Sequence, residues 1–377
     1  MEDIYLDNSA TTVVCKQACD KILEMLSKNY GNPSSLHTKG MDSERELIKA
    51  KKVIADFIKC KESEVYFTSG GTEANNIAIL GACRRRKKLG NKIVASAVEH
   101  SSVIEPLKQL KKEGFEVVYI KPDIYGRIDE KNIEKEIDNN TILVSLMYVN
   151  NEVGAINPVD KVKKIIAKKK SKAIFHMDAV QAFGKLDISV KKLDVDLMTM
   201  TAHKIHGPKG VGALYIKKGV LVSPIVYGGE QESKIRPGTE SIALIAGFSE
   251  AIKALSPLKE KYKEIEDIKD ELISQLKMID GVKINSKEDG FAYIVNFSVP
   301  GIRSETMLHY LEDKGIYVSS GSACSKGKKS HVLSNLGISD ELVDSALRVS
   351  FSRYNTKQDV ISLAKAVEEG ITKIKRR

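Results

Sequence analysis

The 377-residue sequence lacks the patterns that would place it in a specialised class of protein. No apolar run approaches the roughly 20 residues that cross a bilayer, and the opening residues MEDIYLDNSA carry acids where a secretory signal would carry lysines. The five cysteines are an odd number without CxxC spacing, which argues against a disulfide framework and against a zinc site. We therefore expect a cytoplasmic protein with free thiols, no metal and no membrane partner.

Signatures of nucleic-acid binding are also missing, although the formal net charge is +10. Lysines are spread over most helical stretches, and no arginine-rich tract or alternation of aromatic and basic residues stands out. We interpret the charge as a solvated lysine surface and do not expect direct nucleic-acid binding. Transient RNA contact is the alternative.

Short apolar, β-branched runs alternate with helix-period segments from about residue 64 to residue 215. This alternation predicts an α/β layer with a mainly parallel sheet, whose ligand site lies at strand ends and helix N-termini. The predicted strands are 65–69, 92–97, 115–120, 141–149, 173–179, 197–202 and 212–216.

A charged helix predicted over 258–278 separates this pattern from a different one, in which short strands and helices predict a smaller α+β domain. We assign residues 15–257 to a large domain. The small domain would combine residues 1–14 with residues 258–377.

Three motifs follow predicted strands. In TSGGTEANN, Gly71 and Thr72 at a helix start offer backbone N–H groups and a hydroxyl, as a phosphate cradle does, although a capped helix after a glycine turn gives the same pattern. In FHMDAVQAFGK, Asp178 follows a strand and Gln181 lies on a possible first helical turn. The carboxylate could be a helix N-cap, or it could pair with a protonated pyridine nitrogen while the glutamine amide donates to a phenolate oxygen.

The third motif, TAHKIHGPKGVGALYI, contains Lys204 between two histidines and before a Gly-Pro-Lys-Gly turn. A single lysine usually belongs to the solvated surface. A lysine at a strand end among small polar residues is also what a Schiff base with an aldehyde cofactor requires.

The phosphate cradle, the acid and the lysine, in this order, resemble the pyridoxal-phosphate enzymes of fold type I. More narrowly, the sequence is similar to the cysteine desulfurases of the NifS and IscS type in the class V aminotransferase superfamily. The segments that carry the resemblance span nearly the whole chain: YLDNSATT, NPSSLHTKG, FTSGGTEANNIAI, EHSSV, NNEVGAINP, HMDAVQAFGK, AHKIHGPKGVGALY, RPGTES, GSAC and LRVSFSRYNT.

The resemblance implies a homodimer that removes sulfur from L-cysteine, giving L-alanine and a persulfide on Cys324 of the SGSAC loop. Iron-sulfur cluster assembly or tRNA thiolation would consume that sulfur through an acceptor protein. Lys204 would bind pyridoxal 5′-phosphate and move protons at the substrate carbons. His100 would stack on the ring, although a histidine at a strand end is more often only structural.

The family pattern also implies a role for each remaining polar residue. Asp178 would keep the pyridine nitrogen protonated, and Gln181 would contact the ring hydroxyl. Asn151 and Arg348 would bind the substrate carboxylate, for which the planar arginine fork is suited, although Arg348 could be only a surface strand residue. The residues expected at the phosphate are Gly71, Thr72, Thr201 and His203, with Thr239 reaching across from a second subunit.

The sequence departs from the common family pattern after Cys324. The loop is shorter, and KGKK replaces a stretch that usually contains Leu-Glu-Pro. Its three lysines, Lys326, Lys328 and Lys329, would favour the thiolate of Cys324. The shorter basic loop, with no extended C-terminal tail, favours a dedicated acceptor such as a tRNA-thiolating enzyme. We assign the other four cysteines to packing.

Two other enzymatic functions remain open on this fold, a selenocysteine lyase and a class V aminotransferase. A non-catalytic sulfur-relay or RNA-binding protein is the alternative outside the enzymes. Replacing Cys324 with alanine would separate a desulfurase, which needs the loop thiol, from an aminotransferase, which does not.

Overall fold

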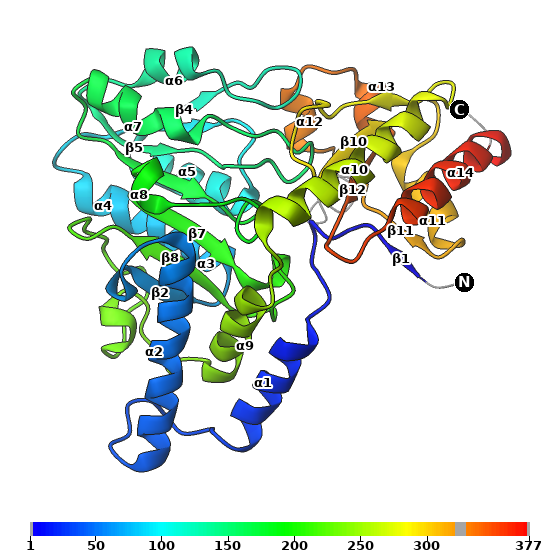
Figure 1. The fold of residues 1–377 in the computed structure, drawn as a ribbon. Helices are drawn as coiled ribbons and strands as arrows, with labels where there is room; N and C mark the ends of the chain where they lie inside the picture. Colours follow the sequence, from blue (N-terminus) through cyan, green and yellow to red (C-terminus); the bar gives the residue numbers. More distant parts are fainter. Residues whose placement is uncertain (1–2, 321–328, 375–377) are drawn as a thin grey trace.

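The computed structural model describes residues 3–320 and 329–374, and its centre is a seven-stranded sheet (Figure 1). The strand order is β2-β8-β7-β6-β5-β3-β4, and β8 is antiparallel to both of its neighbours while the other pairs are parallel. All seven predicted strands are confirmed. They are β2 Val65–Thr68, β3 Lys92–Ser96, β4 Glu116–Ile120, β5 Thr141–Ser145, β6 Ile174–Asp178, β7 Leu197–Thr201 and β8 Gly212–Ile216.

Helices cover both faces of this sheet (Figure 1). Strands β5 to β8 are buried along their whole length because alternate side chains enter two separate cores. Ile93 and Leu197 pack in a core with the helices that follow β2 and β3, whereas Val94 and Met198 pack in the main core on the other face. The helices are α1 Lys16–Ser27, α2 Thr38–Ile58, α3 Gly71–Asn76, α4 Ala82–Arg86, α5 Ser101–Lys112, α6 Glu130–Glu136, α7 Val159–Lys168, α8 Val190–Leu193 and α9 Ile242–Lys253.

Two smaller sheets are built from residues outside 15–257. Strands β9 Lys283–Ile284, β10 Ile294–Ser298 and β12 Ala346–Ser350 form an antiparallel sheet in the order β12-β10-β9. Strand β1 Ile4–Tyr5 pairs in parallel with β11 Ile316–Tyr317, and Asp7 then bridges to Ser350 of β12. The N-terminal segment therefore returns to the C-terminal part of the chain, while the exact domain limits stay a prediction.

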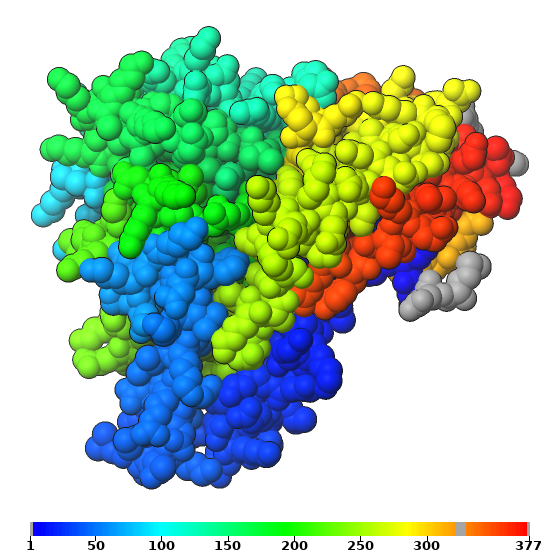
Figure 2. All heavy atoms as spheres, viewed as in Figure 1, coloured from blue at the N-terminus to red at the C-terminus, as the bar shows by residue number. Residues whose placement is uncertain are grey.

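The predicted helix after residue 257 is α10 Leu258–Lys277, and it packs beside α14 Lys357–Lys373 (Figures 1 and 2). The C-terminal part of the chain also contains α11 Ser304–Glu312, α12 His331–Asn335 and α13 Asp340–Asp344. Within the described ranges, no helix has the length and apolar character needed to cross a membrane.

Two expectations about local structure are wrong. Gln181 lies in a turn after β6 instead of a helical turn, because the chain makes only isolated turn bonds there. Cys15 and Cys83 are buried and Cys60 is partly buried, as packing residues should be, but Cys19 is exposed on α1.

Candidate active site

A cavity of about 250 Å³ opens beside the carboxyl ends of the parallel strands. Every predicted cofactor- and substrate-binding residue except Thr239 lines it. Asp178 and Thr201 are the last residues of β6 and β7, and Lys204 ends the 3-10 turn Ala202–Lys204 that follows β7. His100 and Asn151 follow β3 and β5. Parallel strands end at one edge of the sheet, so these residues meet although the sequence separates them.

Asp178 is held in one orientation by two donors and is 5% exposed. Its Oδ1 accepts from the backbone N–H of Val180 at 2.9 Å, and its Oδ2 accepts from Asn75 Nδ2 at 2.9 Å. The same Asn75 nitrogen donates to Ser102 Oγ at 2.8 Å. Asn75, on α3, therefore links the carboxylate to the start of α5.

His100 caps the N-terminus of α5. Its Nδ1 accepts from the backbone N–H of Ser102 at 3.1 Å and from the Ser102 hydroxyl at 2.8 Å. Burial is the main cause that lowers the His100 pKa; Asp178 opposes the shift, whereas Lys204 and His331 add to it. A neutral ring that accepts at Nδ1 carries its proton on Nε2.

The polar chain from Asp178 through Asn75 and Ser102 to His100 was missed by sequence reasoning. Both intermediates lie inside motifs that carry the family resemblance, TEANN and EHSSV. A serine is common at a helix start and an asparagine is common in short polar helices, so no local pattern indicates that these two side chains join two functional residues.

The N-terminal segment forms the wall opposite the strand ends. Lys204 Nζ donates to the backbone oxygen of Ser9 and, at 2.8 Å, to that of Ala10. Gln181 Nε2 donates to the same Ser9 oxygen at 3.2 Å. Gln181 Oε1 is buried without a hydrogen-bond partner among the described residues, which leaves an acceptor at the cavity.

The end of the cavity next to α3 has the features of a phosphate site. A Cβ on Gly71 would lie 2.9 Å from Val180 Cγ2, so the space at this helix start requires glycine. Thr72 and Thr201 add hydroxyls. Burial, with Lys204 second, lowers the His203 pKa to about 4, so its ring is neutral at pH 7. Thr239 is exposed and does not line the cavity of its own chain.

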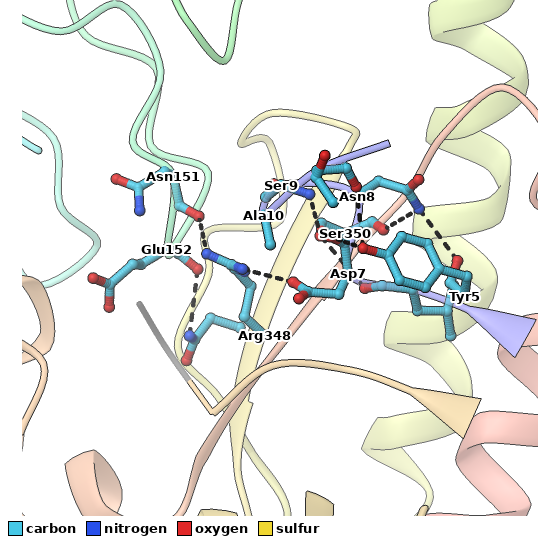
Figure 3. A network of polar contacts seen from close by, with 12 residues as sticks. Tyr5, Asp7, Asn8, Ser9, Ala10, Asn151, Glu152, Arg348 and Ser350 are labelled. Atoms are coloured by element: carbon cyan, nitrogen blue, oxygen red, sulfur yellow. Dashed lines mark hydrogen bonds and ion pairs between the residues drawn. The ribbon is translucent and has the colours of Figure 1, made fainter. Parts of the chain in front are cut away.

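Arg348 projects from β12 and lies between the N-terminal segment and the loop after β5 (Figure 3). Its Nη2 pairs with Asp7 Oδ1 at 2.7 Å, and its Nη1 donates to the backbone oxygen of Asn151 at 3.1 Å. The residue is only 2% exposed, and within the described chain its Nε has no partner. The expectation of a surface strand residue is therefore excluded. Asp7 was missed, although it stands in the quoted YLDNSATT segment.

The class-V aminotransferase family model matches residues 4–363. The chain belongs to the class-V aminotransferase family.

Within that family it groups with the cysteine desulfurases of the NifS and IscS type. It is 39% identical to the cysteine desulfurase IscS of Methanosarcina thermophila, over 99% of this chain and 93% of that protein. It is also 39% identical to the putative cysteine desulfurase IscS 1 of Bacillus subtilis, over 99% of this chain and 100% of that protein. The solved structure of a NifS-like protein superposes with a TM-score of 0.93 at 35% identity, over 99% of this chain and 100% of that chain.

The segment that carries Cys324 is flanked by described residues on both sides. Cys324, Lys326 and Lys328 lie outside the described residues. On the N-terminal side, Ser319 and Arg348 exchange backbone hydrogen bonds of 3.1 and 2.7 Å. On the C-terminal side, Lys329 Nζ lies 2.9 Å from Asp340 Oδ2, so this lysine is already paired with an acid.

Two buried glutamates hold the chain just beyond Lys329. The Ser330 hydroxyl donates to Glu152 Oε2, and His331 Nε2 donates to the backbone oxygen of Glu99 at 2.8 Å. Burial raises the pKa of both carboxyl groups. The described chain on either side of the Cys324 segment is therefore fixed beside the cavity.

Proposed function

We propose that this cysteine desulfurase uses pyridoxal 5′-phosphate bound through Lys204 and transfers the sulfur of L-cysteine to Cys324. In the transfer step, a bond forms between the Cys324 sulfur and the substrate sulfur while the substrate C–S bond breaks. The carbon keeps the electron pair and takes a proton, giving alanine, and Cys324 carries the added sulfur as a persulfide. The observation that carries the proposal is one cavity that combines Lys204, Asp178 and Arg348.

The donor set fits the cofactor. The two donors to Asp178 leave a carboxylate suited to a protonated ring nitrogen, and Gly71 and the hydroxyls suit a phosphate. One N–H of the Gln181 amide donates to Ser9, and the second N–H is available for the ring oxygen. Bound pyridoxal phosphate supplies an electron sink for the charge that develops at the substrate α-carbon. Lys204 holds the cofactor and, when released, moves a proton at that carbon.

Arg348 is proposed to bind the substrate carboxylate. Its Nη2 is committed to Asp7 and its Nη1 to Asn151, so the guanidinium is fixed before the substrate arrives. Nε and the second N–H of each terminal nitrogen are left for a carboxylate, and Asn151 lines the same cavity. Because the guanidinium is already fixed, little conformational entropy is lost when a substrate binds. This favours the binding of a small amino acid, which makes few contacts to offset such a loss.

His100 is proposed to act beside the ring as a neutral group. Its lowered pKa keeps the imidazole uncharged near pH 7, and its Nε2 proton is available because Nδ1 is occupied by Ser102. A neutral imidazole can both give and take a proton near that pH.

Covalent geometry supports Cys324 as the acceptor. Cys324 follows Ser319 by five positions, and five fully extended residues span at most about 18 Å. Ser319 is bonded to the backbone of Arg348, which lines the cavity. We therefore propose that the thiol on this tether attacks the substrate sulfur while β12 stays in place.

The decisive experiment is a single turnover with L-cysteine, measuring alanine and the intact mass of the protein. Wild-type protein should form alanine and gain one sulfur atom. Lys204→Ala and Cys324→Ala should do neither, whereas Cys19→Ala, which removes another exposed thiol, should behave as wild type. Turnover of L-cysteine to alanine by Cys324→Ala without added sulfur would reject the thiol as acceptor.

The proposal also includes the quaternary structure. We propose a homodimer in which Thr239, exposed in its own chain, completes the phosphate site of the partner. A light-scattering mass of one chain for the cofactor-loaded protein would reject this arrangement.

The basic residues Lys326, Lys328 and Lys329 are proposed to serve a dedicated acceptor, such as a tRNA-thiolating enzyme. If serine replaces all three and persulfide transfer to every tested acceptor is unchanged, this part of the proposal fails.

A further inference from the structure

A second, smaller cavity of about 30 Å³ lies on the other side of Lys204 from the active site. Besides Lys204, its lining includes the cationic residues Lys185, Lys261 and Arg353. No acidic residue of the described chain lines it. Lys261 pairs with Glu264 of the same helix, but Lys185 and Arg353 have no carboxylate partner among the described residues.

Lys185 is the most unusual of these side chains. It is 6% exposed, and its Nζ has no hydrogen-bond partner within residues 3–320 and 329–374. The ammonium lies 5.3 Å from the ring centroid of Tyr293 and 5.9 Å from that of Phe291, contacts that replace only part of its lost hydration. Burial, with Lys204 and Arg348 next, lowers its pKa to about 7.

Lys269 shows how this fold satisfies a buried lysine. It is 1% exposed, yet its Nζ donates to the backbone oxygen of Glu288 at 2.6 Å and to that of Gly290 at 2.9 Å. Lys185 has no such pair of carbonyl groups. Since buried polar atoms are nearly always hydrogen-bonded in folded proteins, a partner from outside the chain is expected at Lys185.

Two other donors face the same space. Arg353 Nη1 donates to the backbone oxygen of Ala254 and Nη2 to Tyr354 Oη at 3.0 Å, but its Nε is buried without a partner in the described chain. The first turn of the 20-residue helix α10 also lines the cavity, and its N-cap, Pro257, makes no side-chain cap bond. Uncapped N–H groups at a helix start add positive potential.

We propose that this cavity binds a small monovalent anion, such as chloride, between Lys185, Arg353 and the start of α10. The volume exceeds the 10 to 15 Å³ or so that one water needs, so the cavity has room for a monatomic ion. A water would satisfy hydrogen bonds at Lys185 but would leave its charge uncompensated. An anion accepts the hydrogen bonds and also compensates the charge. It further screens Lys204 from the ammonium of Lys185.

Thermal unfolding of the cofactor-loaded protein tests the site. Sodium chloride is compared with sodium gluconate at constant ionic strength, since gluconate is too large for the cavity. A saturable rise in Tm of about 2 °C with chloride is expected for wild type. Lys185→Met should abolish the rise. The matched variant Lys269→Met should lower the Tm measured without chloride, but its Tm should still rise when chloride is added. An equal response in wild type and Lys185→Met would overturn the proposal.

Crystals of the wild-type protein grown with sodium bromide provide a test that does not depend on the variant folding. An anomalous peak between Lys185 Nζ and Arg353 Nε is expected. Bromide only at surface positions, or an ordered water in the cavity, would overturn the proposal. Neither test uses turnover, so failure here leaves the desulfurase assignment untouched, and failure of the single-turnover assay leaves this site untouched.

Discussion

The active-site cavity has two walls that are built in different ways. One wall consists of side chains at the carboxyl ends of parallel strands, including Asp178 and Lys204. The other consists of the N-terminal segment and β12, where Ser9, Ala10 and Arg348 meet. The first wall follows from a repeated local pattern of strand and turn, whereas the second exists only after the two ends of the chain have come together.

The hydrogen bonds show the same difference. In the strand-end wall, Asp178 and His100 are each fixed by an N–H two residues further along the chain. The contacts made by the second wall link residues that are far apart in the sequence. Gln181 and Ser9 are 172 positions apart, Lys204 and Ala10 are 194 apart, and Arg348 and Asp7 are 341 apart. The first wall is therefore fixed partly by local bonds, with Asn75 as its one long-range donor among those described above, while the distance between the walls depends on the whole fold.

The largest effect is expected from the lysine that spans both walls. Lys204→Ala should lower kcat by about 10⁴-fold or more, because it would remove the amine that we propose holds the cofactor and moves a proton. Lys209→Ala, an exposed lysine on the same turn, is the control and should be unaffected. Steady-state alanine formation measures both, and comparable loss in the two variants would contradict the assignment.

Arg348→Lys weakens the second wall and its contact with the loop after β5. It keeps the charge but loses the fork that contacts Asp7 and Asn151, so kcat/KM for L-cysteine should fall about 100-fold, mostly through KM. Asp7→Asn should lower it less and should also destabilise the protein by about 2 kcal/mol, because a buried cation loses its partner. An unchanged KM in both variants would show that Arg348 does not bind substrate.

Asn75→Ala disconnects Asp178 from Ser102 inside the first wall. We expect about a 10-fold loss in kcat and a shift in the pH dependence of kcat, because two functional groups lose a shared donor. Asn75→Asp should be worse, since a second carboxylate would face Asp178. Asn76→Ala is the control, as its side chain donates only to the Thr72 backbone oxygen, at 2.9 Å. Identical pH profiles in wild type and both Asn75 variants would rule out a positioning role.

The smallest effect at neutral pH is expected when His176 is replaced, two residues before Asp178 in β6. Its ring nitrogens contact Ser145 Oγ at 2.9 Å and Thr199 Oγ1 at 3.2 Å, and burial lowers its pKa to about 4. The unfolded chain takes up a proton near pH 6.5 and the folded chain does not, so stability falls as pH drops from about 6.5 to about 4, by up to about 3 kcal/mol for this group.

His176→Asn should reduce the loss of unfolding free energy between about pH 6.5 and about pH 4, measured by urea unfolding at several pH values. The matched variant His309→Asn, at an exposed position of α11, should lose as much unfolding free energy as wild type. An equal loss in all three proteins would contradict the role of His176.

Strand-end residues were predictable because a buried strand followed by a polar residue is a local signal. The sequence analysis located all seven strands of the large sheet and, with the family resemblance, the residues of the cavity, from Asp178 and Lys204 to Arg348. It missed Asp7 and Asn75, whose roles arise only from tertiary contacts, and it assigned a helical turn at Gln181 because an acid after a strand often caps a helix. Lys185 stands in the quoted segment HMDAVQAFGK, yet nothing local distinguishes it from a surface lysine.

One residue of β12 belongs both to the cavity and to the anchor of the segment that carries Cys324. The side chain of Arg348 lines the cavity, and its backbone exchanges two hydrogen bonds with Ser319, five positions before Cys324. Under the proposed function, the group that binds the substrate carboxylate and the root of the nucleophile segment would therefore share one strand. A displacement of β12 would move the two together.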